Sequence, residues 1–243
     1  MLFLQHVIEA LKEGGRCGMV IDEGVLFRTN EDAFVKTKLK LTDECDLWCV
    51  LSLPGGVFSA AGAGVKTNLL FFTKGKATER IWYYDLADVK VGKKSPLTLK
   101  HFEDFAEKLA SRADSDRSSW TVDLAGRRSK AAAEALPFRE TARAKLREAD
   151  KVREELAALK KAKPRNEAAI GASEAAVRDL VKQSREATGK ADDIENDVYD
   201  LKAVNPHRKP EVDRRTPTEL LDLVEAKGVE IAEALKKLRA LTS

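Results

Sequence analysis

The first residues of the chain alternate between helical and strand-like hydrophobic patterns. Apolar residues recur at the three- and four-residue spacing of one helical face at Phe3, Leu4, Val7, Ile8 and Leu11. Gly14 and Gly15 are expected to end this helix, because glycine is favoured just beyond a helix. The short apolar run 17–21 then predicts a buried strand, and residues 22–24 predict a turn.

Three further apolar runs predict strands, at 47–53, 67–73 and 80–86. A helix is expected over 30–41, capped by Asn30, with apolar positions at Ala33, Phe34, Leu39 and Leu41. Because the strand runs are continuously apolar rather than alternating, helices are expected to cover both faces of the sheet. The pattern therefore predicts an α/β fold whose sheet is small for its class.

After about residue 115 the composition becomes that of charged, alanine-rich helices. Residues 120–124 are a candidate for one more strand. From Pro137 onward, a helical seam is formed by Ala142, Leu146, Ala149, Val152, Leu156 and Leu159. A second helix, ending at about Gly189, carries apolar or small residues at Ile170, Val177, Leu180 and Ser184. These two helices, separated near Pro164, predict an antiparallel hairpin.

A less regular stretch, 192–215, precedes a last helix, for which Thr216 is a suitable cap and Pro217 a suitable first residue. Its narrow apolar stripe consists of Leu220, Val224, Ile231, Leu235 and Leu238. Two interpretations stay open: the three helices pack on one another, or a helix of another chain completes at least one seam. We expect a partial α/β domain over 1–115 and a helical region over 116–243.

Composition excludes several classes of protein. The chain has 243 residues, of which 34% are charged, against about 25% in an average globular protein. The net charge of +3 is too small to indicate nucleic-acid binding by itself. There is no apolar run of the roughly 18–20 residues that cross a bilayer, and no basic start of a signal peptide. These features predict a soluble, cytoplasmic protein that does not contact membranes.

Catalytic and metal-binding patterns are scarce. Cys17, Cys45 and Cys49 lack CxxC spacing, so reduced buried thiols are expected rather than a metal site or a disulfide framework. The three histidines are scattered, and the motifs HExxH, GxSxG and GK[ST] are absent. Asn205-Pro206 is followed by histidine, so it is not the Asn-Pro-Pro-aromatic signature of amino-methylating enzymes. We therefore assign no catalytic residue and no metal ligand.

Several segments nevertheless resemble one family in order and spacing. Residues Gly14–Phe27 resemble the region just after the catalytic motif in the methylation subunit of type I restriction-modification systems. Leu51–Phe58 and Val65–Lys74 are similar to the next two strands of that family and their loop. Tyr199–Pro206 and the helix 219–241 are similar to its carboxyl-terminal end.

The resemblance implies an activity and a fold. Such subunits use S-adenosylmethionine to methylate the exocyclic amine of adenine in DNA, while a specificity subunit reads the sequence. The resemblance also implies a seven-stranded sheet in which strands five, seven and six lie side by side, here 16–21, 69–73 and 47–53. The expected fold is thus the carboxyl-terminal half of a Rossmann-like class I methyltransferase sheet, followed by an α-helical region.

The chain also departs from the family. The glycine-rich cofactor loop and the Asn-Pro-Pro-aromatic motif, which precede the similar region, occur nowhere in residues 1–243. We therefore expect neither S-adenosylmethionine binding nor methyl transfer by this chain alone. It looks like the back part of a methylation subunit, starting at an internal methionine, as a truncated gene or a split protein would.

Carried over residue by residue, the resemblance suggests three sites. Phe58 is the candidate for stacking on a flipped-out target base, against the alternative of a core anchor. Lys66 and Thr67 are candidates for DNA phosphate contact, against a solvated lysine and a strand-starting threonine. The last helix is expected to bind the specificity subunit through the stripe Leu220, Val224, Ile231, Leu235 and Leu238.

The edge of the first strand lacks the neighbour that it has in the family. We expect this edge to take a strand from a missing amino-terminal methyltransferase half, or to cause self-association. The alternative function is a non-catalytic helical interaction module that binds a specificity-type subunit.

Overall fold

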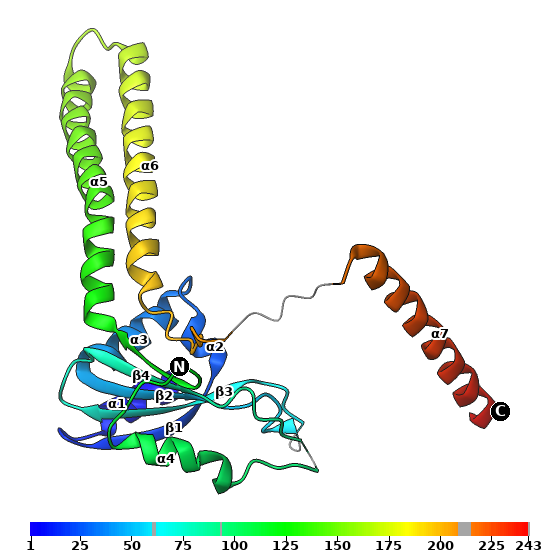
Figure 1. Ribbon diagram of the computed structural model, residues 1–243. Coiled ribbons are helices and arrows are strands. Elements are labelled where there is room, and N and C mark those ends of the chain that lie inside the picture. The colour runs from blue at the N-terminus through cyan, green and yellow to red at the C-terminus, as the bar shows by residue number, and fades with distance from the viewer. Residues whose placement is uncertain (60–61, 93, 209–214, 243) are drawn as a thin grey trace. The chain divides into compact units, whose positions relative to one another are not determined.

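The computed structural model describes residues 1–59, 62–92, 94–208 and 215–242 (Figure 1). The chain divides into two compact units, Met1–His207 and Arg208–Ser243. The first unit contains the sheet and the helical hairpin, and the second contains the last helix. The predicted domain boundary near residue 115 stays a prediction.

A five-stranded mixed sheet forms the centre of the first unit. In the order β1-β3-β2-β4-β5, its strands are Arg16–Asp22, Thr67–Lys74, Cys45–Ser52, Arg80–Asp85 and Ser119–Asp123. β3 runs antiparallel to β1 and β2, β4 runs parallel to β2, and β5 runs antiparallel to β4. The strands predicted at 16–21, 69–73 and 47–53 thus lie side by side in the expected order; their assignment to half of a Rossmann-like sheet stays a prediction.

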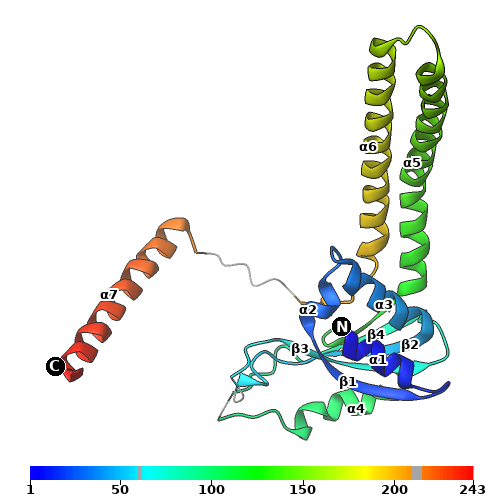
Figure 2. The same cartoon turned by 180° about the vertical axis from the view of Figure 1, so that it is seen from behind.

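Helices cover both faces of the sheet, as the α/β prediction requires (Figures 1 and 2). On one face, α1 (Leu2–Ala10), α2 (Glu23–Phe27) and α3 (Asp32–Glu44) share a hydrophobic cluster with the first turns of α5 (Leu124–Lys161) and the segment 198–203. The other face is covered by α4 (Glu103–Leu109), which follows the short 3₁₀ helix Leu99–Phe102.

Aromatic packing holds α4 on its face of the sheet. The ring of Phe105 lies with its centroid 5.2 to 6.2 Å from those of Phe71, Trp82 and Tyr84. The hydroxyl of Tyr84 donates a hydrogen bond to the Asp104 carboxylate, which anchors the start of the same helix.

The prediction of a buried first strand is wrong for most of its residues. Only Ile21 is buried in β1, and Val20 is 48% exposed. The reason is position: β1 is an edge of the sheet, and α4 packs instead over Trp82 and Tyr84 of β4. A continuous apolar run does not distinguish an edge strand from a central one.

Three local predictions near the start also need correction. Residues 22–24 begin α2 rather than a simple turn, because the Asp22 carboxylate accepts a hydrogen bond from the Gly24 amide at 2.6 Å. The next helix begins at Asp32, so Asn30 is not its cap. In α1, Leu4 and Ile8 are buried, but Phe3 is 71% exposed and lies outside the packed stripe.

The predicted antiparallel hairpin is confirmed, with longer helices than expected. α5 (Leu124–Lys161) begins directly after β5, where the Asp123 carboxylate accepts from the Gly126 amide at 2.9 Å. Pro137 therefore lies inside α5, and α6 (Glu167–Asp197) continues past Gly189. The irregular stretch expected from residue 192 thus begins only after α6 ends.

The most deeply buried residues of the hairpin are mostly small, whereas Val152, Leu156 and Leu159 of the predicted seam are half-buried. The buried positions are Ala131, Ala135, Ala142, Ala149, Ile170, Ser184, Ala187 and Ala191. The Ser184 hydroxyl donates to the Ala142 carbonyl at 2.9 Å across the hairpin. Leu146, expected in the seam, is exposed, because close helix approach needs small side chains.

The second unit is the single helix α7 (Pro217–Thr242). Its predicted start is confirmed by a capping box: the Glu219 carboxylate accepts from the Thr216 amide at 2.6 Å, and the Glu219 amide donates to the Thr216 hydroxyl at 3.3 Å. Residues 209–214, within the predicted irregular stretch, lie outside the described residues. In the part of the chain that the structure describes, no helix combines the length and apolarity that crossing a membrane needs.

Candidate functional site

The segment that holds the predicted DNA-contacting residues connects β2 to β3 and lies at the carboxyl ends of β1 and β2. Because β1 and β2 both run antiparallel to β3, their carboxyl ends meet the start of β3. Asn68 stands in register between Ile21 of β1 and Ser52 of β2. The loop between β2 and β3, residues 53–66, starts and ends at this edge; residues 60 and 61 lie outside the described part.

Phe58 lies in this loop and is partly exposed to solvent. It is 36% exposed and belongs to neither hydrophobic cluster of the sheet. Gly56, two residues before it, has φ +84°, a backbone conformation that L side chains rarely adopt. The glycine-rich sequence is therefore required locally by the turn that presents Phe58.

Lys66 is held by a carboxylate that sequence reasoning did not single out. Its ammonium lies 2.9 Å from Glu23 Oε1, and its carbonyl accepts from the Glu23 amide at 3.0 Å. Lys202, from the segment after the hairpin, lies 3.8 Å from the other Glu23 oxygen. Glu23 is only 13% exposed, so this cluster of one acid and two lysines ties α2, the loop and the tail segment together.

Thr67 and its neighbours form a buried polar group at the same edge. Thr67 is 7% exposed, and Ser52 and Asn68 are fully buried. Among the described residues, none accepts or donates a hydrogen bond to the Thr67 or Ser52 hydroxyl or to the Asn68 side-chain amide. A buried polar group without a hydrogen bond costs about 1–3 kcal/mol of folding free energy. These three residues therefore lower the stability of the strand ends. Lys66 and Thr67 are thus adjacent, but only Lys66 reaches the surface.

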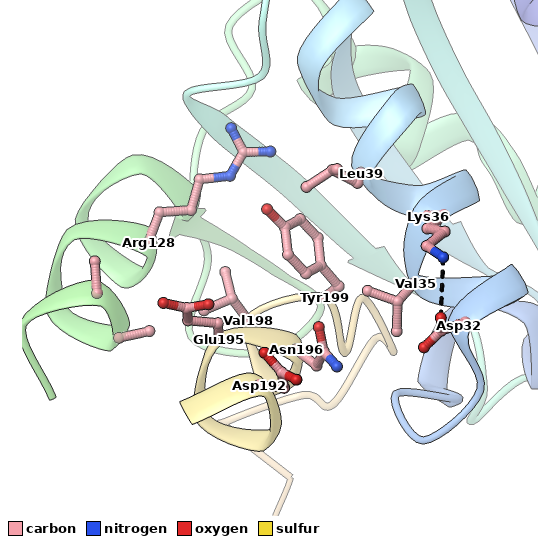
Figure 3. A pocket seen from close by; sticks show the side chains of 12 residues that line it. Asp32, Val35, Lys36, Leu39, Arg128, Asp192, Glu195, Asn196, Val198 and Tyr199 are labelled. Atoms are coloured by element: carbon pink, nitrogen blue, oxygen red, sulfur yellow. Dashed lines mark hydrogen bonds and ion pairs between the residues drawn. The ribbon is translucent and has the colours of Figure 1, made fainter. Parts of the chain in front are cut away.

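A cavity of about 520 Å³ lies where α3, α5 and α6 meet (Figure 3). Tyr199 stands at its centre, and the Arg128 guanidinium lies 5.5 Å from the centroid of the tyrosine ring. Burial raises the pKa of the Tyr199 phenol. The Arg128 guanidinium donates a hydrogen bond to the Thr42 hydroxyl at 2.6 Å and lies 2.8 Å from the Asp43 carboxylate.

The other charges of this cavity are also neutralised within the chain. Asp192 and Glu195 both bind Arg139, the former at 2.6 Å, and Lys36 binds Asp32 at 2.9 Å. Each carboxylate that lines the cavity thus has a cation within ion-pair distance. The cavity has the composition of a helix junction rather than of a catalytic centre.

The cysteines do not form a reactive group. All three are free; Cys45 and Cys49 are buried, while Cys17 is half-buried. Burial raises the pKa of Cys45 to about 11 and that of Cys49 to about 12, so both stay protonated thiols at neutral pH. The described residues contain no cluster of three or more His, Cys, Asp or Glu side chains arranged to hold a metal ion.

Comparison with known proteins decides the family. The sequence profile of the N-6 DNA methylase family matches residues 1–131, which include α1 to α4 and all five strands. The chain belongs to the N-6 DNA methylase family.

This methylase-family chain is similar to curated methylase subunits of type I restriction enzymes. It is 38% identical over 136 residues to the EcoEI methylase subunit of Escherichia coli, covering 51% of this chain and 26% of that protein. It is 39% identical over 116 residues to the EcoKI methylase subunit of Escherichia coli strain K12, covering 43% of this chain and 21% of that protein. The resemblance seen in the sequence is thereby confirmed, and the matched region spans about a quarter of these relatives.

One solved structure matches the methylase-family chain almost throughout. It concerns complex assembly and conformational transition of the type I restriction-modification system. The match covers 99% of this chain and 38% of that chain, with 28% identity and a TM-score of 0.50. The likeness therefore includes α5 to α7, beyond the region matched by the family profile.

Proposed function

We propose that this chain is the carboxyl-terminal portion of a type I restriction-modification DNA adenine methyltransferase subunit. It contributes the loop that contacts the target base and DNA, and the helix that binds a specificity subunit. The observation that carries the proposal is the match over 99% of the chain to a structure of the type I system. Methyl transfer needs the glycine-rich cofactor loop and the Asn-Pro-Pro-aromatic motif, neither of which lies within residues 1–243.

The partial exposure of Phe58 supports the base contact. A base taken out of the DNA stack loses its stacking energy, and an aromatic side chain restores part of it. Phe58 is 36% exposed on a loop that leaves the carboxyl edge of the sheet, where α/β proteins bind their ligands. Lys66 lies at the end of the same loop and forms an ion pair with Glu23. To contact a DNA phosphate, its ammonium group has to break this ion pair or to bind the carboxylate and the phosphate together.

The residues present do not fit S-adenosylmethionine. Binding such a cofactor in this fold class needs a glycine-rich turn that lets the backbone approach it. The cavities at the junction of α3, α5 and α6, beside Trp120 and on the outer part of the hairpin have no glycine in their lining. Glu23, which follows the carboxyl end of β1, is already bound by Lys66 and Lys202. We therefore derive no catalytic step through the cofactor.

The free edge of β1 supports the need for a further strand. In the described part of the chain, β1 pairs only with β3, and Val20 is 48% exposed on it. An unpaired edge with apolar side chains is a template for strand addition. We propose that a missing amino-terminal methyltransferase half occupies it, and that the isolated chain self-associates there.

The exposed stripe of α7 supports the specificity-subunit contact. Its five members, from 37% to 67% exposed, are Leu220, Val224, Ile231, Leu235 and Leu238. A long helix with a narrow apolar stripe is typical of helix-to-helix interfaces between chains. The same stripe favours the alternative function, a non-catalytic helical module that binds a specificity-type subunit.

The contact is tested by measuring the affinity of the chain for the specificity subunit of the EcoEI system by calorimetry. Val224→Asp with Ile231→Asp places two charges on the stripe, and we expect the affinity to fall by more than about tenfold. Ala226→Asp with Val229→Asp adds the same charges to other faces of α7 and serves as the control.

Equal affinities for the wild-type chain and the stripe variant would contradict the proposed interface. Equal losses for the stripe variant and the control would mean that net charge, rather than the stripe, governs binding. Either result leaves the family membership of the chain intact.

A further inference from the structure

The outer part of the α5–α6 hairpin is positively charged, although the chain as a whole is almost neutral. Residues 143–190 contain 13 Lys and Arg against 8 Asp and Glu. The basal parts, 124–142 and 191–197, together contain 4 Lys and Arg against 6 Asp and Glu. Positive charge therefore gathers on the part of the hairpin that projects away from the sheet (Figure 2).

A groove of about 520 Å³ lies on this outer part. Arg178, Lys182 and Arg185 of α6 line it, and their spacing of four and three residues places them on one helical face. Arg153 of α5 lines the opposite side, and Glu186 is the one acid in the lining. Its apolar floor is small, consisting of Val177 and Val181.

Arg153 binds Asp150 at 2.7 Å, and Lys182 lies 3.9 Å from Glu186. Among the described residues, Arg178 and Arg185 make no salt bridge within 4.0 Å, although Arg178 is close enough to Glu174 to lower the pKa of that carboxyl. Two guanidinium groups thus face the groove with their hydrogen-bond donors available.

We propose that this groove binds the phosphate backbone of double-stranded DNA, away from the loop that carries Phe58. The proposal deepens the proposed function, because it rests on DNA being the substrate of the assembled enzyme. Guanidinium groups match phosphate oxygens with paired donors, and phosphate contacts position a protein on DNA without reading its sequence.

The dimensions and chemistry of the groove favour DNA over a protein partner. Arg178 and Arg185 are separated by seven residues, about 10 Å along the helix axis, so they reach different phosphates of one strand, which follow one another every ~3.4 Å along the duplex axis. The apolar floor is too small for the buried centre that a stable protein interface needs. An acidic protein segment is the other occupant that the charge would attract.

The test measures how the affinity of the full chain for a short labelled duplex of random sequence depends on salt. Each phosphate contact contributes about 0.9 to the slope of log affinity against log salt. The variant Arg178→Gln, Lys182→Gln, Arg185→Gln is expected to lower the magnitude of that slope by about 2.7. Its helical circular dichroism should be unchanged, because glutamine is a good helix former.

The control removes three positive charges elsewhere: Lys36→Gln, Lys76→Gln and Lys130→Gln, each in an ion pair outside the groove. It should keep the slope of the wild-type chain. An absence of duplex binding by the wild-type chain, or equal slopes in both variants, would overturn the proposal. Loss of specificity-subunit binding with an unchanged duplex slope would assign the groove to a protein and equally overturn it.

Failure here is distinguishable from failure of the proposed function. The probe has no target sequence and the readout is binding alone, so neither base contact nor methyl transfer enters the result. Phe58→Ala, which removes the proposed base contact, should leave the salt slope of the wild-type chain unchanged.

Discussion

At the scale of single residues, Glu23 joins three segments that are far apart in the sequence. Its carboxylate holds Lys66 at the end of the β2–β3 loop and lies near Lys202 in the tail segment. Its amide donates to the Lys66 carbonyl, so the loop is held by both backbone and side chain. The position of the Phe58 loop thus depends on a residue to which the sequence pattern assigned no role.

We predict that Glu23→Gln loosens this loop at a small cost in stability. The substitution keeps the size of the side chain and removes both ion pairs, and a partly exposed pair contributes up to about 1 kcal/mol. Urea unfolding should show a decrease of that order in the free energy of unfolding. Limited proteolysis should cut the variant faster between residues 53 and 66.

Glu31→Gln is the matched control, because Glu31 pairs with Arg28 at 3.4 Å on the surface, outside the loop. Cleavage of that control at the same rate as Glu23→Gln would show that Glu23 has no particular role in holding the loop.

Contacts between residues that are distant in the sequence could not be predicted from the sequence. Phe58 and Lys66 were predicted as DNA-contacting residues because they lie in two segments with a family resemblance, and both reach the surface. Glu23 was missed because its partners are 43 and 179 positions away, and no local pattern reports such pairing. The burial of Thr67 was missed for a similar reason, since it depends on strands on both sides.

At the scale of elements, the spacing of apolar residues located the strands but not their burial. The runs at 47–53, 67–73 and 80–86 correspond to β2, β3 and β4. The run at 17–21 was located equally well, but it forms an exposed edge, which depends on the order of strands rather than on composition.

The hairpin shows a related limit. Periodicity gave the two helices and their antiparallel arrangement, but the leucines that define the pattern are not its most deeply buried residues, since Leu156 and Leu159 are only half-buried. Ala142 and Ala149 are buried against α6, while Leu146 is exposed. Small residues carry no strong hydrophobic signal, although they set how closely the two helices approach.

We predict that Ala149→Leu destabilises the hairpin. Ala149 is fully buried, so three added carbon atoms force the helices apart at a cost of about 1–3 kcal/mol. Thermal unfolding followed by helical circular dichroism should show a lower midpoint for this variant.

Ala157→Leu, at an exposed position of the same helix, is the control and should leave the midpoint nearly unchanged. If Ala149→Leu left the midpoint unchanged as well, the assignment of the alanines as the hairpin contact would be wrong.

At the scale of the whole molecule, the chain combines a sheet edge, a projecting hairpin and a helix with an exposed stripe. The cavities at the helix junction, beside Trp120 and on the outer part of the hairpin have no glycine in their lining, and residues 1–243 hold no Asn-Pro-Pro-aromatic motif. Our account therefore assigns base contact, DNA backbone contact and subunit binding to this chain. It assigns the cofactor and the orientation of the adenine amine to residues outside 1–243.

The most direct test of this division is a calorimetric titration of S-adenosylmethionine into the purified chain. The titration is then repeated after mixing the chain with the amino-terminal part of the EcoEI methylase subunit. We predict no binding heat for the chain alone and saturable binding for the mixture that exceeds any binding by the added part alone. Saturable one-to-one binding by the chain alone would contradict the account.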